Sequence, residues 1–435
     1  MRQPEVRYAE QNGDYLAFTV FGDGPVDLAV TQARFPIDLM WDLPQLAGFM
    51  EALGRVARVI AWDHRGFGAS DPISYTDSRI EALADDLNAV LEAAGSDRAT
   101  VFQMGAGPHS VVHAASHPDR VRSLILVNFR PSFPEFGPLS ARQRKKLAMS
   151  LRRPERLSLE NPRFAHDPSV QQWWGKAVRL GNTPEEAARV IERGAHIDIQ
   201  PVLPTLRVPT LVLHRRDNRV WDLATSRDAT SQIPDARFVE LPGSENDIFL
   251  GDTVPVLSEI ERFLQKPETT PTHDRVLATV LFTDIVASTE QLAARGDDAW
   301  GQILDDHDRA VERLVATYRG RIVKSTGDGI LAIFDGPARA VRCATDIVHA
   351  ADEQGVRLRA GLHTGEIEIR SADVVGIAVH TANRIASLAG PGEILVSRTV
   401  VDLTAGSGLQ FEGRGEHQLK GVPGTWATFA AQPSL

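Results

Sequence analysis

The sequence predicts an α/β protein of two domains, in which a doubly wound, mostly parallel sheet is followed by a smaller α+β domain. Three observations support this fold class. The chain has 435 residues, which is more than one ordinary core accommodates. Short apolar runs alternate with helical stretches up to residue 264, and after residue 274 the order of strands and helices changes.

Six short apolar runs in the first region have the length of strands, and helical stretches such as Ser78–Ala94 separate them. The expected strands are Asp27–Val30, Val56–Trp62, Thr100–Phe102, Val121–Asn128, Thr210–His214 and Arg237–Leu241. This alternation is typical of a parallel sheet with helices on both faces. Between residues 130 and 200 the sequence becomes polar and arginine-rich around Trp173 and Trp174, which predicts a helical cap over the strand ends.

A break in composition at Gln265–Asp274, with two prolines and three threonines, predicts an interdomain linker. The two domains are therefore expected at 1–264 and 275–432. In the second domain the expected order is strand, long helix, two strands, helix, two strands, helix and strand. Glycine-containing turns are expected at Ser325–Gly329 and at Thr364–Glu366.

The composition excludes several classes of protein. A net charge of −10 argues against a nucleic-acid partner, because general nucleic-acid binders carry a basic surface that neutralises phosphates. We expect no membrane span, because no apolar run is long enough, and the N-terminus has no apolar core of a secretion signal. The single cysteine, Cys343, excludes an intrachain disulfide, fits a reducing compartment and is expected to be buried. The cytoplasm is the expected location.

Two segments of the first region, WDHRGFGASDP at 62–72 and HPDRVRSLILVN at 117–128, resemble the α/β-hydrolase family. In that family a serine in a G-x-S-x-G elbow, between a strand and a helix, is activated by a histidine and an acid. Here the elbow falls on 102–106, and Met104 occupies the serine position. A thioether cannot be deprotonated into a nucleophile, so acyl transfer is not expected at this residue.

The other two members of the hydrolase proton-transfer chain are also replaced. The family acid falls on Asn218, with Asp217 beside it, and the family histidine falls on Asn246. Because an amide cannot relay a proton, the hydrolase-like domain is expected to be catalytically inactive. Two interpretations stay open for it: a folded relic that serves dimer contacts or solubility, and a pocket that binds a small-molecule ligand and regulates the second domain.

Two aspartates of the second domain lie where strands are expected to end. The run RVLATVLFTDIVAST at 275–289 is typical of an apolar strand that carries Asp284 at its exit, followed by a helix. The run RIVKSTGDGILAIF at 321–334 predicts a β-hairpin whose turn carries Asp328 between two glycines. Carboxylates on the tips of adjacent strands can share metal ions, since hard cations prefer oxygen ligands.

These segments, with RAGLHTGEIE at 359–368 and DVVGIAVHTANRIASLAGPGEILVS at 373–397, resemble the catalytic domain of class III adenylyl and guanylyl cyclases. Several motifs agree in order and spacing across the whole second domain. The resemblance implies a ferredoxin-like α+β fold in which Asp284 and Asp328 hold two divalent cations, Mg²⁺ or Mn²⁺.

The resemblance also implies how the substrate is held. Backbone N–H groups of a strand-to-helix turn around Phe282, Thr283 and Ile285 are expected to face its phosphates. Lys324, four positions before the hairpin aspartate, and Asp373 are expected to recognise adenine, by donating to N1 and accepting from the 6-amino group. Guanine presents the reversed pattern and would leave both side chains without partners.

Three further residues are assigned by the same resemblance. Arg384, eleven positions after Asp373, is expected to stabilise the charge that develops on the α-phosphate, and Lys420 to contact the terminal phosphates. His380 departs from the family pattern, which usually has an asparagine that orients the ribose. Imidazole can still donate a hydrogen bond, so the departure affects the expected rate or pH dependence more than the reaction type.

The family builds its active site between two catalytic domains, and this chain holds both sets of residues, so a head-to-tail homodimer is expected. The sequence thus predicts an adenylate cyclase, a phosphorus-oxygen lyase that converts ATP to 3′,5′-cyclic AMP and pyrophosphate for signal transduction. Two alternatives stay open. One is a guanylyl cyclase, and the other is an α/β-hydrolase (esterase) with a non-signalling C-terminal domain.

Overall fold

The computed structural model describes residues 3–32, 34–72, 80–105, 108–137, 139–195, 197–265, 275–325, 329–370 and 373–432. The chain divides between Pro271 and Thr272 into two compact units. The expected linker, 265–274, lies outside the described residues except for Gln265. Within the described ranges, no helix combines the length and the hydrophobicity that a transmembrane segment requires.

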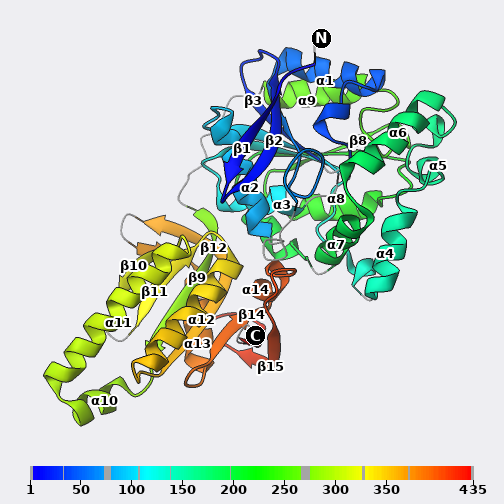
Figure 1. Ribbon diagram of the computed structural model, residues 1–435. Helices are drawn as coiled ribbons and strands as arrows, with labels where there is room; N and C mark the ends of the chain where they lie inside the picture. The colour runs from blue at the N-terminus through cyan, green and yellow to red at the C-terminus, as the bar shows by residue number, and fades with distance from the viewer. Residues whose placement is uncertain are drawn as a thin grey trace. The chain divides into compact units, whose positions relative to one another are not determined.

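The first unit is built on an eight-stranded sheet in the order β1-β2-β4-β3-β5-β6-β7-β8 (Figure 1). The six strands from β4 to β8 along this order run parallel, and all six expected strands are confirmed. An antiparallel hairpin, β1 and β2, extends the sheet at one edge and was not expected. The strands are β1 Val6–Gln11, β2 Asp14–Phe21, β3 Asp27–Gln32, β4 Arg58–Trp62, β5 Ala99–Met104, β6 Val121–Val127, β7 Thr210–Arg215 and β8 Arg237–Leu241.

Helices cover both faces of this sheet, as expected for a doubly wound fold. In Figure 1, α1 (Pro44–Val56) and α9 (Val254–Leu264) lie side by side, and α2 (Ile80–Ala93) lies beside α3 (Pro108–Ser116) on the other face. The main hydrophobic core joins the strands to the apolar faces of α1 and α9. A further helix, α8 (Leu223–Ser231), packs against β7 and β8.

A helical cap occupies the region between residues 130 and 200, as predicted. It contains α4 (Ala141–Ser150), α5 (Arg156–Glu160), α6 (Pro168–Gly181) and α7 (Pro184–Gly194). The indole of Trp173, on α6, is buried and donates from Nε1 to the carbonyl of Leu39 at 2.9 Å. The cap is therefore anchored to the segment that follows β3.

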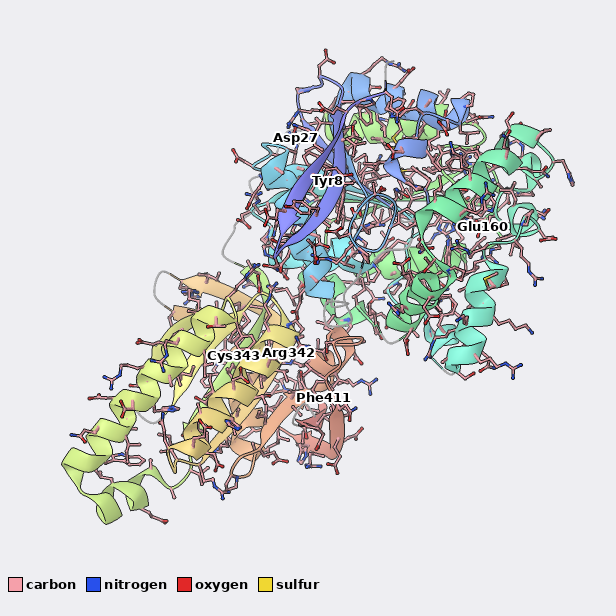
Figure 2. The ribbon with its side chains drawn as sticks, in the orientation of Figure 1. Tyr8, Asp27, Glu160, Arg342, Cys343 and Phe411 are labelled. Atoms are coloured by element: carbon pink, nitrogen blue, oxygen red, sulfur yellow. The ribbon has the colours of Figure 1, made fainter. Side chains whose placement is uncertain are left out.

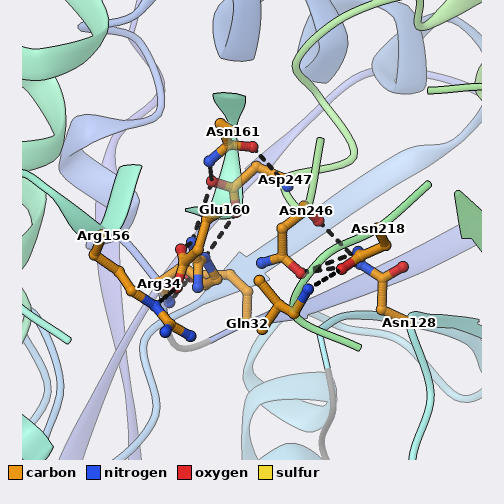
Figure 3. A network of polar contacts seen from close by, with 10 residues as sticks. Gln32, Arg34, Asn128, Arg156, Glu160, Asn161, Asn218, Asn246 and Asp247 are labelled. Carbon is orange, nitrogen blue, oxygen red and sulfur yellow. Dashed lines mark hydrogen bonds and ion pairs between the residues drawn. The ribbon is translucent and has the colours of Figure 1, made fainter. Parts of the chain in front are cut away.

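A charge network ties the cap to the segments that follow strands β3 and β8 (Figure 3). The Arg34 guanidinium forms ion pairs with Glu160 at the end of α5 and with Asp247, the latter at 2.7 Å. Arg156 Nε donates to Glu160 at 2.7 Å, and Asn161 Nδ2 donates to Asp247 at 2.7 Å. Because each carboxylate is paired, the charges can be buried without being left unsatisfied.

The second unit contains a sheet in the order β10-β11-β9-β12-β14-β16-β15, with β13 paired to β12. The long strand β9 lies between β11 and β12 and is antiparallel to both. The strands are β9 Arg275–Ile285, β10 Arg321–Ser325, β11 Ile330–Phe334, β12 Leu358–Arg370, β13 Asp373–Val375, β14 Ile394–Ser397, β15 Phe411–Gln418 and β16 Thr425–Ala431. The β10–β11 hairpin agrees with the predicted one.

Two cores lie on opposite faces of this sheet. Successive residues of β9 alternate between them: Leu281 packs with α11 (Asp297–Thr317) and α12 (Pro337–Glu353), and Val280 packs with α13 (Ile377–Leu388). Cys343, on α12, is fully buried (Figure 2), and burial raises the pKa of its thiol to about 12. The prediction of a buried cysteine is confirmed. Two shorter helices, α10 (Ser288–Arg295) and α14 (Arg398–Leu403), complete the unit.

The turn expected at Thr364–Glu366 is wrong, because β12 runs without interruption from Leu358 to Arg370. Its glycines serve helix packing instead. A Cβ atom on Gly361 would lie 2.1 Å from the backbone nitrogen of Ala386, and one on Gly365 would lie 3.0 Å from the Cβ of Ala378. Both contacts are with α13, which these glycines allow to lie close against the strand.

Candidate functional site

Asp284 lies at the end of β9, directly opposite Arg359 on β12. Arg359 donates from Nε to the Asp284 carboxylate at 2.7 Å, and Nη2 contacts the same oxygen. About a third of each side chain is exposed, 31% for Asp284 and 35% for Arg359. The carboxylate is therefore accessible to a ligand and already has a cation beside it.

The β10–β11 hairpin is seated on the end of β9. A Cβ on Gly329 would lie 1.9 Å from the carbonyl oxygen of Thr283 and 3.0 Å from the Cα of Asp284, so glycine is required for this close approach. The backbone N–H of Ile330 donates to Thr283 Oγ1 at 3.2 Å. Asp328 lies outside the described residues, and its predicted pairing with Asp284 stays a prediction.

The residues expected in the phosphate-binding turn are strand residues. Phe282, Thr283 and Ile285 all lie inside β9 and pair with β12, and the Ile285 side chain is buried in the core. Val286 and Ala287 form the connection to α10, and Ala287 has a left-handed backbone with φ 58°. The expected turn thus begins later than predicted, and contact of these three residues with a phosphate stays a prediction.

Lys324 and Asp373 lie together, as expected for a pair that recognises one base. Lys324 Nζ, on β10, donates to both carboxylate oxygens of Asp373, on β13, at 3.0 Å each. This hydrogen bond, together with one from the backbone N–H of Val374, lowers the pKa of Asp373. Both side chains are 48% exposed, so a planar polar molecule can reach them from solvent.

Arg384 and Lys420 are also brought together. Arg384 is exposed on α13, and its Nε donates to the backbone carbonyl of Lys420 at 3.0 Å. Lys420 lies in the segment between β15 and β16, with its side chain exposed. His380, one helical turn before Arg384, is exposed on the same face of the helix. Two cations and an imidazole therefore line one accessible surface.

Sequence reasoning missed Arg359. Its place beside Asp284 follows from the register of β9 against β12, which pairs the two residues although 75 positions separate them. The sequence around Arg359 does not indicate a functional role, because an arginine at the start of a strand is commonly solvated. No cluster of three or more potential metal-ligating side chains occurs in the described ranges, which leave out 326–328.

In the first unit the three replaced hydrolase positions meet at the ends of the strands. Met104 is the last residue of β5, is 6% exposed and is followed by Gly105 with φ 111°. Met104 and Asn246 line one small cavity, and Asn218 Nδ2 donates to Asn246 Oδ1 at 3.3 Å. The arrangement of a hydrolase is retained, but it contains a thioether and two amides.

Comparison with known proteins agrees with both units. Residues 269–432 match the adenylate and guanylate cyclase catalytic domain, and residues 43–253 match the alpha/beta hydrolase fold. An adenylate cyclase of Streptomyces coelicolor is 34% identical over 125 residues, which is 28% of this chain and 32% of the relative. A putative adenylate cyclase 3 of Rhizobium meliloti is 28% identical over 157 residues, covering 34% of this chain and 27% of the relative. The chain spans about a third or less of the length of these curated relatives.

Among solved structures, a thermophilic esterase from Thermogutta terrifontis is similar to the first unit, with a TM-score of 0.51 and 25% identity. The match covers 61% of this chain and 100% of the esterase. The chain therefore joins an N-terminal unit with the α/β-hydrolase fold to a C-terminal class III cyclase catalytic domain.

Proposed function

We propose that the protein is an adenylate cyclase, which converts ATP to 3′,5′-cyclic AMP and pyrophosphate. The observation that carries this proposal is the contact between Lys324 and Asp373, because it puts one donor and one acceptor on a solvent-accessible edge. Adenine presents the complementary edge, with an acceptor at N1 and a donor at the 6-amino group. Guanine presents a donor at N1 and an acceptor at O6, so both protein groups would meet like partners.

Asp284, together with Asp328, is proposed to hold two divalent cations, Mg²⁺ or Mn²⁺. The donor set fits such ions, since carboxylate oxygens are the ligands that they prefer. Gly329, the residue after Asp328, packs against the backbone of Asp284, which supports a site made by both segments. When bound, such ions lower the pKa of the ribose 3′-hydroxyl and neutralise charge on the triphosphate.

The remaining polar side chains act on the phosphates and the ribose. The ribose 3′-hydroxyl releases its proton to solvent, its oxygen attacks the α-phosphorus, and the bond from this phosphorus to the oxygen bridging to the β-phosphate breaks. Arg384 is proposed to stabilise the negative charge on the α-phosphate, and Lys420 the charge on the leaving pyrophosphate. His380, on the same face as Arg384, is proposed to donate a hydrogen bond to the ribose in place of the usual asparagine.

The active site is proposed to form between two copies of the chain. In this arrangement one copy supplies Asp284 and Asp328, and the other supplies Lys324, Asp373 and Arg384 together with His380 and Lys420. A head-to-tail dimer then has two equivalent sites. The first unit is proposed to be non-catalytic and to serve a regulatory or structural role, because Met104, Asn218 and Asn246 provide neither nucleophile nor base. ATP as substrate and a buried free thiol are consistent with a cytoplasmic enzyme.

Incubation of the full chain with Mn²⁺ and either ATP or GTP, followed by quantification of the cyclic product, tests the proposal. We expect cyclic AMP to form with a kcat/KM at least about tenfold above that for cyclic GMP. The Asp284→Ala variant serves as the inactive control. Formation of cyclic GMP alone would retain the cyclase and overturn the base assignment, and absence of both products would overturn the cyclase itself.

A further inference from the structure

A cavity of about 320 Å³ lies in the first unit, between the cap and the strand ends. This volume is at the lower end of the range for sites that hold small molecules. Apolar side chains from the core and from the cap make most of its wall, among them Phe67, Leu83, Phe133, Phe136, Ile191 and Trp221. A ligand that fills it must therefore be small and largely apolar.

One end of the cavity is polar. Gln103 is 4% exposed and lines it, and its Oε1 accepts a hydrogen bond from Ser110 Oγ at 2.6 Å. Among the described residues, the Gln103 Nε2 amide has no hydrogen-bond partner. Because this amide lines the cavity and has a free donor there, it favours a ligand that brings an acceptor.

Two histidines lie beside this end of the cavity. His64 and His109 both line it, and their Nε2 atoms contact Thr31 Oγ1 at 2.7 and 3.3 Å. Their rings meet edge to face, with centroids 4.8 Å apart. The acceptor head of a ligand would therefore meet imidazole groups as well as the Gln103 amide.

The charges around the cavity favour the same kind of head. Arg34 and Arg65 contribute to the lining, and no acidic side chain does so among the described residues. Each guanidinium group is paired with two carboxylates that do not line the cavity, so an ammonium head would find no carboxylate partner in the described lining. A carbonyl or carboxylate head is compatible with this surface, and an ammonium head is not.

Met104 lies in the wall of this cavity, at the place where a hydrolase has its nucleophile. We propose that the cavity is a binding site for a small apolar acyl compound, a carboxylic acid or its ester, which is held without being cleaved. The acyl oxygen accepts a hydrogen bond from Gln103, and the hydrocarbon part contacts the aromatic wall. This inference goes beyond the cyclase reaction and does not depend on it.

Isothermal titration calorimetry of the full chain with hexanoate, methyl hexanoate and hexylammonium tests the proposal. We expect saturable binding of the acid and the ester with one site per chain, and at least about tenfold weaker binding of hexylammonium. Absence of binding by both acyl probes at millimolar concentration would contradict the site. Equal binding of hexylammonium would contradict the class of ligand, and release of hexanoate from the ester would contradict the absence of cleavage.

Two variants on the cap locate the binding. Val190, on α7, lines the cavity and is 39% exposed, so Val190→Trp can fill the space without disturbing the core. Leu180, on α6, is 55% exposed and does not belong to the lining, so Leu180→Trp is the matched control. We expect Val190→Trp to weaken hexanoate binding at least about tenfold and Leu180→Trp to leave it within about twofold. Equal affinities in the two variants would place the binding elsewhere.

A third variant tests the polar end. Gln103→Glu keeps the shape of the side chain and an acceptor for Ser110, but it replaces the amide donor by a negative charge. We expect it to weaken the binding of hexanoate at least about tenfold more than that of methyl hexanoate, because only the acid carries a like charge. If the affinity for both probes falls by the same factor, or does not change, Gln103 does not make the proposed contact with the acyl head.

Discussion

The Lys324 ammonium donates to both oxygens of the Asp373 carboxylate at 3.0 Å, across 49 positions of sequence. This contact joins β10 to β13, which are not neighbours in the sheet order. Because both side chains are about half exposed, the pair contributes little to stability and is accessible for the base recognition proposed above.

Replacement of Lys324 tests this interpretation. We expect Lys324→Ala to lower kcat/KM for ATP by about 10- to 100-fold, since a hydrogen bond from a charged donor is lost, and to lower the ratio of ATP to GTP turnover. Arg321, an exposed cation on the same strand, provides the control Arg321→Ala, for which little change is expected. An unchanged ratio of the two nucleotides would remove Lys324 from base recognition.

Mixing two inactive variants tests the shared site. Asp284→Ala and Arg384→Ala chains are each expected to be inactive alone. When they are co-expressed at equal levels, about a quarter of the wild-type activity should return, since half of the dimers would carry one intact site of two. The double variant on one chain, mixed with wild type, is the control for subunit exchange. If no ratio of the single variants restores cyclic AMP, each chain works alone.

The contact between Arg359 and Asp284 predicts an effect on metal binding. Arg359→Ala removes a cation beside the carboxylate, so we expect the dissociation constant for Mn²⁺ without nucleotide to fall several-fold, by about 1 kcal/mol for a partly exposed charge. Arg357→Ala is the matched control, because Arg357 is 63% exposed and pairs with Asp352 instead. Calorimetric titration measures both, and weaker binding in Arg359→Ala would exclude competition between the arginine and the ion.

The buried histidine of β12 predicts a pH dependence of stability. Burial lowers the pKa of His363 from 6.5 to about 4, and its Nδ1 contacts Ser397 Oγ at 2.8 Å. Between these values the unfolded chain binds a proton that the folded chain does not, so stability is full above pH 6.5 and falls as the pH drops towards 4. Between pH 7 and pH 5, this histidine should lower the free energy of unfolding by about 2 kcal/mol.

Urea unfolding of the wild type and of His363→Gln at both pH values measures this difference. His349 is 75% exposed, so His349→Gln should retain the full pH dependence. If the free energy of unfolding falls by the same amount between the two pH values in all three proteins, a group other than His363 causes the pH dependence.

The first unit is predicted to lack esterase activity and to regain it in a defined variant. The full chain should not cleave 4-nitrophenyl butyrate above the spontaneous rate. Since Asn218 and Asn246 are in hydrogen-bond contact at 3.3 Å, the triple variant Met104→Ser, Asn218→Asp, Asn246→His recreates a nucleophile, an acid and a base in the right order. We expect the triple variant to exceed the spontaneous rate about 100-fold, and Met104→Ser alone to remain inactive. Turnover by the wild type would contradict the assignment.

The sequence predicted the six parallel strands because buried strands of such sheets are continuous apolar runs. It did not predict the β1–β2 hairpin, since β1 is an edge strand whose Tyr8 is 55% exposed (Figure 2) and whose pattern is mostly polar. A signal was present in the Asn12-Gly13 turn, where both residues have positive φ, 55° and 86°. Such a dipeptide is typical of a two-residue hairpin.

Candidate site residues that share one element could be assigned from the spacing of the family motif, as for His380 and Arg384, which both lie on α13. It was not predicted where two strands must first be aligned, as for Arg359 opposite Asp284. Gly365 led to the wrong prediction of a turn, because glycine, which permits a turn, also permits a helix to approach a strand closely. Local sequence does not distinguish these two uses.

Arg384 is held by the main-chain carbonyl of residue 420 and not by its side chain. Substitution at position 420 can therefore change the number of positive charges facing a polyphosphate while the guanidinium stays anchored. Under the proposed roles of these two residues, product release and bond formation could be adjusted separately during evolution, because the side chain at position 420 can change while the Arg384 guanidinium stays bound to the backbone.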